Sequence, residues 1–384
     1  MTPGARRWRR ARAVVALILL PLSLLALHTA WPRGHGDVEL PVGGQWSGPM
    51  GPFTAAGVVH VHTAEHSQDA RAPRAALVAA ARDNHLAFLV LADHEAPQPL
   101  GPGVRARFED GVLLVAGSEW SADDAHVFDL SPTPGRAGYA AVKDALPDCL
   151  ARGGPCVAAH PTAWRRPWRP ALTGVHGVEI HSSMTGLGDR VRPPFVSLVA
   201  TAWTVLLNPG YGLWLEGAFD PAAVTLWEAY APLQPLAAYC GADVHGLLPI
   251  RENMLAYTTL LALDAPLSSD AAVAHHQVLR ALGNAVCTNM LAGRVDGLTV
   301  SHAASTVDAY ARLTGALGPA SLVLFHHGEE RARVLFVDGE ARATAPRVAG
   351  PWRAVVEVET PGAWGRVNNS AAIRLHLVPV DGGG

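Results

Sequence analysis

Histidines and acidic residues follow a short apolar run near the start of the chain, in the segment VVHVHTAEHSQDA (residues 58–70). His60, His62 and His66 come directly after two valines, and Asp69 lies just behind them. Imidazole nitrogens and carboxylate oxygens together suit zinc, iron or manganese. Alternate residues of a strand point to one face, so His60 and His62 can bind one metal ion together. The segment therefore predicts a metal site.

The same residue types recur where later strand-like segments end. The further candidates are Asp93, His94, Glu119, His126, His160, Asp243 and His245. Glu119 can bridge two metal ions because a carboxylate has two oxygens. Two neighbouring metals activate water and stabilise an in-line displacement at phosphorus, so no serine or cysteine nucleophile is needed. We expect a site that holds two or three divalent ions of zinc, manganese or iron.

Strand-like runs alternate with alanine-rich helical stretches from about residue 57 onward. The strands are expected at GVVHVH, AFLVLADH, GVLLVAGSEW, AHVFDL, PCVAAHP, GVEIHSS and LAAYCGADVHG. Helices are expected over residues 73–85, around AAVKDALPDCLARG and near PAAVTLWEAYA. Such alternation predicts parallel βα units. In a β/α barrel the site forms at the carboxyl ends of the strands, which is where the candidate residues fall.

The flanks of this region differ from it in composition. Residues 1–31 combine a basic stretch, RRWRRAR, with an apolar one, which is typical of a signal peptide or a membrane anchor. Residues 32–54 are rich in glycine and proline and indicate a linker. Residues 55–300 would form the barrel, and the short alternating runs within residues 301–384 predict a small C-terminal β-sandwich-like domain. We expect the folded part outside the cytoplasm, either membrane-anchored or, after signal cleavage, periplasmic or secreted.

One segment, residues 192–217, interrupts the alternation. It is long, apolar and rich in tryptophan, but Asn208, Pro209 and Gly210 break it too strongly for a membrane span. Three interpretations stay open for it. It can be a helical insertion that packs on the barrel, a lid over the site, or a surface that dips into the membrane beside the N-terminal segment.

The composition of the chain disfavours several classes of function. The net charge of −3 and the pI of about 6.6 give no general basic surface, so nucleic acid is not indicated as a partner. Lys143 is the only lysine, which disfavours a lysine nucleophile. The chain has no CxxC pair, so a structural zinc site of that kind is not expected. Cys156 and Cys240 lie in apolar runs typical of buried thiols, and a Cys149–Cys156 disulfide can form in an oxidising compartment.

The motifs VVHVHT, LADH, GSEW, AAHP and GADVHG, in that order, are far more specific than any one of them. In this order the chain resembles the PHP (polymerase and histidinol phosphatase) domain metallohydrolases, and more narrowly their carbaryl-hydrolase-like branch, over roughly residues 55–300. The resemblance implies an α/β fold, a distorted TIM-like (β/α)7 barrel. It also implies one metal on His60, His62, Glu119 and Asp243, a second on Glu119, His126 and His160, and a third on His94, His245 and either His66 or Asp69.

Departures from the family pattern leave one ligand undecided. The segment HVHTAEHSQDA carries one extra residue and has Ala70 in place of a glycine, so the choice between His66 and Asp69 stays open. Residues expected to orient ligands or to face the substrate are Asp93, Glu179 and His181. Candidates to bind a substrate phosphate are Arg165, Arg166 and Arg169, because arginine forks match phosphate oxygens; the alternative is a solvated basic loop.

The expected function is that of a metal-dependent hydrolase. We expect a phosphoesterase that uses a metal-activated hydroxide on a small-molecule phosphoester. Asp243 or His245 would pass a proton to the leaving group. Two alternatives stay open: hydrolysis of a carboxylic ester, carbamate or amide at the same metals, and a non-catalytic cell-surface binding module.

Overall fold

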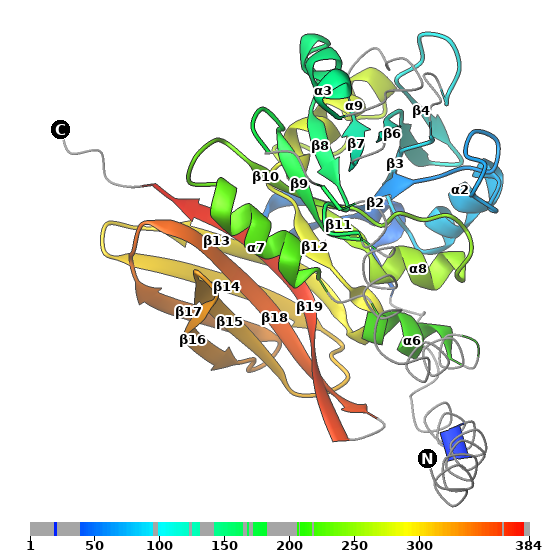
Figure 1. The fold of residues 1–384 in the computed structure, drawn as a ribbon. Coiled ribbons are helices and arrows are strands. Elements are labelled where there is room, and N and C mark those ends of the chain that lie inside the picture. Colours follow the sequence, from blue (N-terminus) through cyan, green and yellow to red (C-terminus); the bar gives the residue numbers. More distant parts are fainter. Residues whose placement is uncertain are drawn as a thin grey trace, which may run out of the picture.

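The structure is a computed structural model of the 384-residue chain. It describes residues 19–20, 39–94, 99–122, 125–130, 142–163, 167–168, 172–182, 206, 208–216, 219–362 and 365–379. Strands dominate this part of the chain, with 43% of it in strands and 21% in helices. The strands form three sheets, and the helices lie around them (Figure 1).

The largest sheet combines strands from both halves of the chain. Its strands are β1 (Gln45–Gly48), β2 (Gly51–Val61), β3 (Phe88–Leu91), β4 (Ala106–Glu109), β5 (Val112–Val115), β11 (Thr258–Leu263), β12 (Val286–Thr288), β15 (Ala320–His326), β16 (Glu329–Leu335), β18 (Gly350–Gly362) and β19 (Gly365–Val378). Their order is β16-β15-β18-β19-β12-β11-β2-β3-β5-β4, and β1 pairs with β2. Among the described strands of this sheet, only the β2–β3 and β3–β5 pairs are parallel. The β12–β19 pairing makes the sheet continuous between the N-terminal and C-terminal parts.

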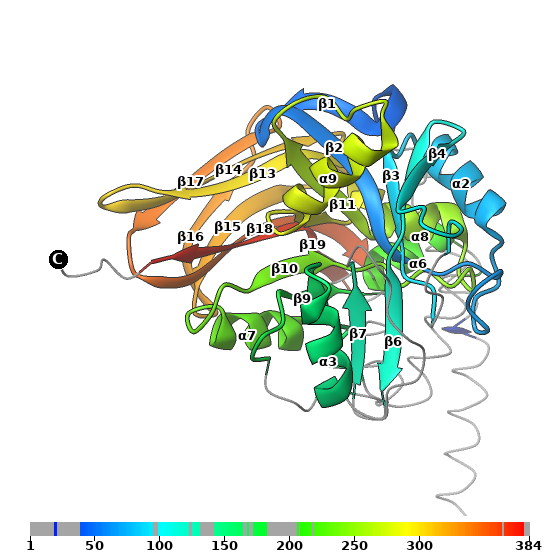
Figure 2. The same ribbon diagram turned by 90° about the horizontal axis from the view of Figure 1, so that it is seen from above.

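Two smaller sheets complete the strand framework. The five-stranded sheet has the order β10-β9-β8-β7-β6 and consists of β6 (Ser118–Ala122), β7 (Ala125–Asp129), β8 (Cys156–Ala159), β9 (Gly177–His181) and β10 (Ala237–Cys240). The three-stranded sheet consists of β13 (Arg294–His302), β14 (Thr306–Thr314) and β17 (Glu340–Pro346), in that order. Figure 2 shows β13, β14 and β17 as a layer over β15, β16, β18 and β19. This layering gives the C-terminal part a sandwich arrangement of two sheets.

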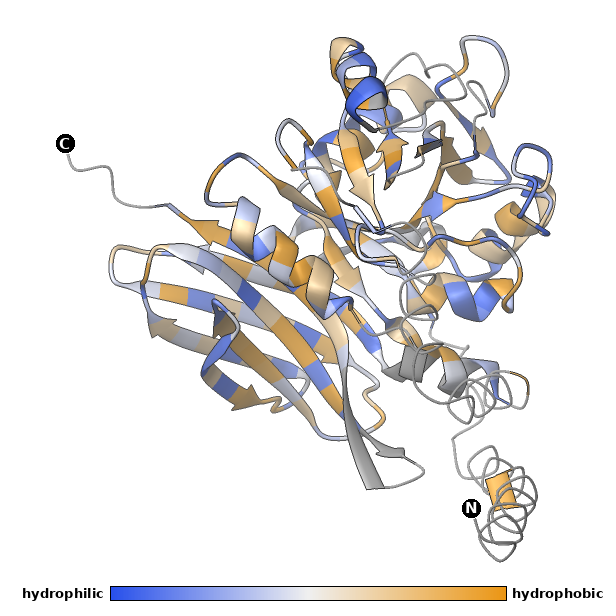
Figure 3. Ribbon diagram, viewed as in Figure 1, coloured by the Kyte–Doolittle hydropathy of each residue, from blue (hydrophilic) through white to orange (hydrophobic). Residues whose placement is uncertain are grey.

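Alternating side chains build the core of that sandwich. Strand β14 is buried at every second residue, and Val307 and Ala311 on its inner face join the same core as Leu322 and Val356 of the facing sheet. Figure 3 shows the same alternation of apolar and polar residues along these strands. The short strands expected from the sequence within residues 301–384 are found there, among them β15, β16, β18 and β19.

The described helices are α2 (Arg74–Asp83), α3 (Val142–Ala151), α6 (Pro209–Glu216), α7 (Pro221–Tyr230), α8 (Ile250–Ala256) and α9 (Ala271–Leu282), with 3-10 turns at Val42–Gly44 and Met290–Ala292. Asp220 is the N-cap of α7 and Asp270 is the N-cap of α9, since each carboxylate accepts two backbone N–H groups of the first turn. The helices expected over 73–85, near AAVKDALPDCLARG and near PAAVTLWEAYA are confirmed as α2, α3 and α7. Helix α7 packs on β9, and its Glu228 pairs with Arg353 of β18 at 3.3 Å.

The predicted (β/α)7 TIM-like barrel is wrong. The described strands form large mixed and antiparallel sheets, and no closed barrel exists among them. The pairs β4–β5, β6–β7 and β7–β8 are antiparallel, which a ring of parallel βα units excludes. The segment GVLLVAGSEW, expected as one strand, divides into β5 and β6, which belong to different sheets. The division falls at Gly117, where a Cβ would lie 2.6 Å from the carbonyl oxygen of Leu91.

The large sheet and the five-stranded sheet meet at two isolated bridges. Val61 at the end of β2 bridges Val244, which follows β10, and His94 after β3 bridges Glu119 of β6. Backbone hydrogen bonds support these contacts, from His62 N to Val244 O at 2.9 Å and from Glu119 N to Asp93 O at 3.3 Å. The ends of strands that lie far apart in the sequence are therefore side by side.

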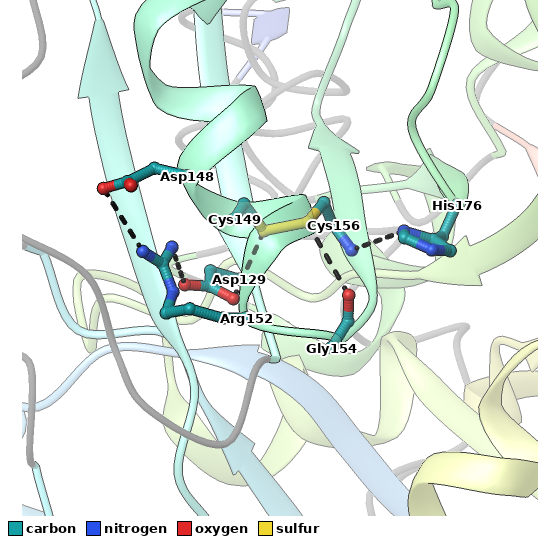
Figure 4. The surroundings of a disulfide bond; sticks show 7 residues. All are labelled: Asp129, Asp148, Cys149, Arg152, Gly154, Cys156 and His176. Carbon is teal, nitrogen blue, oxygen red and sulfur yellow. Dashed lines mark hydrogen bonds and ion pairs between the residues drawn. A yellow bond between two sulfur atoms is a disulfide. The ribbon is translucent and has the colours of Figure 1, made fainter.

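All four cysteines, each within the described part of the chain, form disulfides: Cys149–Cys156 and Cys240–Cys287. The interpretation of Cys156 and Cys240 as buried thiols is therefore wrong. The Cys149–Cys156 bond ties α3 to β8, beside the Asp129–Arg152 ion pair of 3.0 Å (Figure 4). The Cys240–Cys287 bond joins β10 to β12 and so connects the five-stranded sheet to the large sheet.

Removal of the long-range disulfide is expected to destabilise the protein more than removal of the local one. Cys240 and Cys287 are 47 residues apart in the sequence, whereas Cys149 and Cys156 are 7 residues apart. Loop entropy alone then predicts a loss of about 4 kcal/mol for the variant C240A/C287A and about 2 kcal/mol for C149A/C156A. Urea unfolding of both variants under oxidising conditions measures the difference. An equal or larger loss in C149A/C156A would contradict this expectation.

Two predicted segments lie largely outside the described residues. Of residues 1–31, the structure describes only Leu19 and Leu20, and of residues 192–217 it describes Leu206 and residues 208–216, which contain α6. Within the part of the chain that is described, no helix has both the length and the apolar character needed to cross a membrane. The signal or anchor at the N-terminus and the role of the insertion stay predictions.

Candidate metal centre

The candidate ligands come together where the two sheets meet. His60 lies near the end of β2 and His62 follows that strand. His94 follows β3, and His160 follows β8. Glu119 is on β6 and His126 on β7, while Asp243 and His245 follow β10. Residues His60, His62, Glu119, Asp243, His160 and His245 are all at most 7% exposed. Neighbouring imidazole rings among them have centroids 4.2–5.7 Å apart. The geometry thus brings together side chains that are spread over 186 residues of sequence, from 60 to 245.

The HxH pair is built on an irregular strand end. The pairing of β2 with β3 shifts register between Val59 and Val61, and His60 at that shift has a φ of 69°. The two rings still face the same site, with centroids 5.0 Å apart. The bulge, and not a regular strand of period two, therefore directs His60 toward the site.

Three of these residues adopt left-handed backbone conformations. The φ angles are 69° for His60, 26° for His160 and 52° for Asp243. Side chains beyond Cα make positive φ unfavourable, by about 1–3 kcal/mol per residue, so such conformations persist where the surroundings hold them. Their occurrence at three strand ends around one cluster is typical of a functional site.

One oxygen of Glu119 faces the HxH pair. Its Oε2 lies 3.2 Å from His60 Nε2 and 3.3 Å from His62 Nε2. Asp243 Oδ1 lies 3.6 Å from His60 Nε2 and 3.2 Å from His62 Nε2. Around a tetrahedral ion with bonds of about 2.0–2.1 Å, neighbouring ligand atoms are about 3.3 Å apart. These four of the six distances among the atoms are therefore close to the spacing of a tetrahedral ligand set.

The second oxygen of Glu119 faces a different pair of histidines. Its Oε1 lies 2.8 Å from His160 Nε2 and 3.0 Å from His126 Nδ1. His126 reaches this side because it pairs with Ser121 across the β6–β7 hairpin, on the same face as Glu119. Glu119 is thus shared between two groups of imidazoles, as a bridging carboxylate is.

A third group lies beside the first. Asp69 Oδ2 is 3.3 Å from His94 Nε2 and 3.2 Å from His245 Nε2. His62 lies close enough to these two histidines for all three to offer nitrogens within 4.8 Å of one another. His66 has an exposed side chain, and its backbone N–H bonds to Thr63 O. Of the two candidates that the sequence left open, the structure places Asp69 against the cluster.

Asp93 and Ser67 fix the orientation of His62. Ser67 Oγ donates to Asp93 Oδ1 at 3.0 Å and lies 3.2 Å from His62 Nδ1. Because the serine proton points to Asp93, Ser67 accepts from His62 Nδ1–H and also from His94 N at 2.9 Å. The lone pair of His62 is then on Nε2, the atom that faces Glu119 and Asp243. Asp93 also accepts from Thr63 N at 2.6 Å, which anchors the turn after β2.

The remaining predicted residues occupy different places. Glu179 on β9 contacts His60 directly, at 2.5 Å between Oε1 and Nδ1. His181 is buried against the rings of Phe219 and Tyr257, with centroids 4.6 and 4.4 Å away. The three arginines that were predicted to bind a substrate phosphate lie outside the described residues: Arg165, Arg166 and Arg169.

Charges in the cluster shift the titration of its histidines. Burial alone lowers the pKa of His60, but the carboxylates of Glu179, Glu119 and Asp243 raise it well above its ordinary value. Burial likewise opposes protonation of His62, yet Asp243 and Glu119 raise its pKa from 6.5 to about 9. In the absence of metal, protons on these imidazoles therefore balance the buried carboxylates.

The carboxylates shift in the opposite direction. Burial favours the neutral acid of Glu119, but His60, His126 and His160 hold its pKa well below the usual range. The pKa of Asp243 is also lowered far below normal, against the effect of burial, by neighbouring histidines. Both groups are therefore anions at neutral pH, which is the state that binds a cation.

Metal-free protein is expected to lose stability as pH rises from 6.5 through about 9. The folded-state pKa of His62 is raised from 6.5 to about 9, so the stabilising proton is fully bound below pH 6.5 and is lost as pH passes about 9. His60 acts in the same direction. Melting temperatures measured in chelator between pH 6 and pH 10 test this expectation, with His62→Gln as the comparison that flattens the profile. A constant or rising melting temperature would contradict it.

The residues fit a divalent metal. Within the described part of the chain, the buried Nε2 of His62 makes no hydrogen bond of acceptable geometry, although two carboxylate oxygens lie 3.2 and 3.3 Å away. A buried lone pair that faces two anionic oxygens is unfavourable unless a proton or a cation lies between them. The chemistry of the donors, imidazole and carboxylate, suits zinc, manganese or iron.

Some features of the site were not predicted from the sequence. Phe128 stacks on His60 with ring centroids 5.1 Å apart, yet it is an ordinary apolar residue of β7. Gly241 leaves space for Glu179, because a Cβ there would lie 2.1 Å from Oε1 of that glutamate. The glycine of the GADVHG motif was the available signal for this close approach.

The chain matches no protein-family model, and no curated protein matches it. Its function is therefore inferred from the side chains that meet at the strand ends.

Proposed function

We propose that this chain is a metal-dependent hydrolase that acts on phosphoesters. The observation that carries the proposal is the position of Glu119, whose Oε2 faces His60 and His62 and whose Oε1 faces His126 and His160, at 2.8–3.3 Å. A shared carboxylate between two ligand groups is the arrangement of two-metal sites, which hydrolyse phosphoesters by clamping the attacking and leaving oxygens. The order of the sequence motifs, which resembles that of the PHP metallohydrolases, supports the same function, because the motif residues are the ones that meet at this site.

The proposed ligands divide between the two sides of Glu119. On one side are His60, His62 and Asp243, and on the other are His126 and His160, with a further position at Asp69, His94 and His245. Bound there, zinc, manganese or iron would lower the pKa of a water molecule and neutralise charge that develops on the phosphoryl group. The chain contributes a buried, preorganised set of anions and imidazoles that needs little rearrangement on metal binding.

His245 is the proposed proton donor to the leaving group, with Asp243 as its partner. His245 Nδ1 lies 3.1 Å from the carbonyl oxygen of Asp243, so Nδ1–H donates there, and Nε2 would carry the transferable proton when no metal occupies the position beside Asp69. Nε2 points to Asp69, which is 55% exposed, so the donor lies on the open side of the cluster. A group in this position can pass a proton outward to a leaving group.

The disulfides support a location outside the cytoplasm. Both bonds are buried, and cytosolic thiols are normally kept reduced. Together with the basic and apolar composition of residues 1–31, they favour an exported protein, either anchored to the membrane or released from it.

A substrate panel tests the proposal. The purified chain, loaded with zinc, manganese or iron, is expected to hydrolyse p-nitrophenyl phosphate or bis(p-nitrophenyl) phosphate faster than p-nitrophenyl acetate or a naphthyl carbamate. The control variant His276→Ala, which changes an exposed histidine of α9, should keep this activity. Turnover of the acetate or carbamate alone would overturn the phosphoester assignment in favour of a carbon centre. Metal binding without turnover of any of the four would favour the binding module.

A further inference from the structure

Glu179 occupies an unusual place beneath the cluster. It lies on β9 of the five-stranded sheet and is 1% exposed, yet it contacts His60 on β2 of the other sheet. Its two oxygens have different partners: Oε1 lies 2.5 Å from His60 Nδ1, and Oε2 accepts from His160 N at 2.8 Å. Each partner belongs to a different side of Glu119.

The first contact sets the tautomer of His60. A carboxylate accepts, so His60 Nδ1 carries the proton and donates it to Glu179. The lone pair is then on Nε2, which lies 3.2 Å from Glu119 and 3.6 Å from Asp243. This presents His60 as a ligand on the Oε2 side of Glu119.

The second contact holds the backbone from which His160 extends. His160 has a φ of 26°, so its conformation depends on its surroundings. The hydrogen bond from His160 N to Glu179 Oε2 stabilises that turn, and the ring then reaches Glu119 Oε1 at 2.8 Å. The same carboxylate therefore also positions a ligand on the Oε1 side.

Gly241 provides the space that Glu179 needs. A Cβ at Gly241 would lie 2.1 Å from Oε1 and 2.3 Å from Cδ of Glu179. Gly241 is two residues before Asp243. The segment that carries the ligand Asp243 therefore packs directly on Glu179, which orients His60 and His160.

We propose that Glu179 is a positioning residue that couples the two sides of the metal centre, so that both metal positions depend on this one carboxylate. The proposal rests on the metal-dependent function proposed above. Loss of a residue that orients metal ligands typically weakens metal binding by about 10–100-fold. Here we expect that loss at both positions, because Glu179 holds one imidazole of each.

The test compares metal affinity in Glu179→Gln with the wild type, by competition for Zn²⁺ against a chromophoric chelator. The glutamine keeps the size of the side chain and one oxygen acceptor, but its amide nitrogen cannot accept the N–H of His160. At least one Zn²⁺ affinity is expected to fall by about 10–100-fold in this variant, because a single oxygen cannot accept from both His60 Nδ1–H and His160 N–H. The matched control is Asp129→Asn, a buried carboxylate that pairs with Arg152 away from the cluster, and its Zn²⁺ affinities should stay unchanged.

Gly241→Ala provides an independent route, because it displaces Glu179 without altering its chemistry. It should weaken Zn²⁺ at both positions, while Glu179→Asp should retain more affinity than Glu179→Gln. Gly241→Ala carries the comparison with the wild type if Glu179→Gln yields no folded protein.

A second readout separates positioning from a purely structural role. A structural role would lower the melting temperatures of the metal-free and Zn²⁺-loaded protein equally. Positioning predicts that the rise in melting temperature on adding Zn²⁺ shrinks in Glu179→Gln. Unchanged Zn²⁺ affinities in Glu179→Gln, or weakening at one position only in Gly241→Ala, would overturn the coupling role while the proposed function stands. A wild-type protein that binds no metal would instead overturn the proposed function.

Discussion

Replacing Glu119 by glutamine is expected to remove metal from both sides of the cluster and to lower hydrolysis by about a thousandfold or more, since metals contribute several kcal/mol to such reactions. Both oxygens of Glu119 face histidine nitrogens, at 3.2 and 3.3 Å on one side and 2.8 and 3.0 Å on the other. An amide offers one neutral oxygen and one N–H donor, so it cannot serve both groups. Elemental analysis and turnover of a phosphoester substrate measure the two losses.

The matched control is Glu228→Gln, which changes a half-buried glutamate of α7 that pairs with Arg353. It should keep full metal content and activity. Retention of two metals per chain by Glu119→Gln would show that the glutamate does not bridge two ions.

Replacing Asp243 by asparagine is expected to remove the metal from one side only. Asp243 Oδ1 lies 3.2 Å from His62 Nε2, 3.6 Å from His60 Nε2 and 3.3 Å from His245 Nδ1. His160, on the other side of Glu119, also offers a nitrogen within 4.8 Å of Asp243, but it is held by Glu119 Oε1 at 2.8 Å. We therefore expect about one metal less per chain and an activity loss of about a thousandfold, because two-metal catalysis requires both ions.

The control for this variant is Asp270→Asn, which changes the exposed N-cap residue of α9, far from the ligands in the sequence. It should leave the metal content unchanged. If Asp243→Asn lost metal from both sides, as Glu119→Gln should, the division of ligands between the two oxygens of Glu119 would be wrong. Full activity in Asp243→Asn would exclude it from the site altogether.

The sequence predicted the convergence of ligands far better than the fold that produces it. His60, Glu119, His160 and Asp243 all follow or occupy strands, and strand ends can be recognised from local apolar runs. Which strands pair, and in which direction, depends on contacts between distant segments. GVLLVAGSEW gave no local sign that β5 and β6 separate into two sheets, and the antiparallel β6–β7 hairpin replaced an expected parallel unit.

Two details of the site show the same limit on local patterns. Cys240 and Cys287 are 47 residues apart, and only the approach of β10 to β12 makes them partners. Asp69 and His66 were equal candidates by spacing, and the turn after β2 decides between them by exposing His66 and placing Asp69 beside His94 and His245. Glu179 was expected near the ligands, but its contact with two of them follows from packing that spacing does not encode.

The most direct test of the central claim is the number of metal ions bound per chain. The purified protein would be stripped with chelator, reconstituted separately with zinc, manganese and iron, and measured by elemental analysis, with His60→Ala alongside. The arrangement of ligands around Glu119 predicts at least two ions per wild-type chain with one of these metals, and fewer in His60→Ala. One ion or none in the wild type, or equal content in His60→Ala, would contradict the two-metal centre.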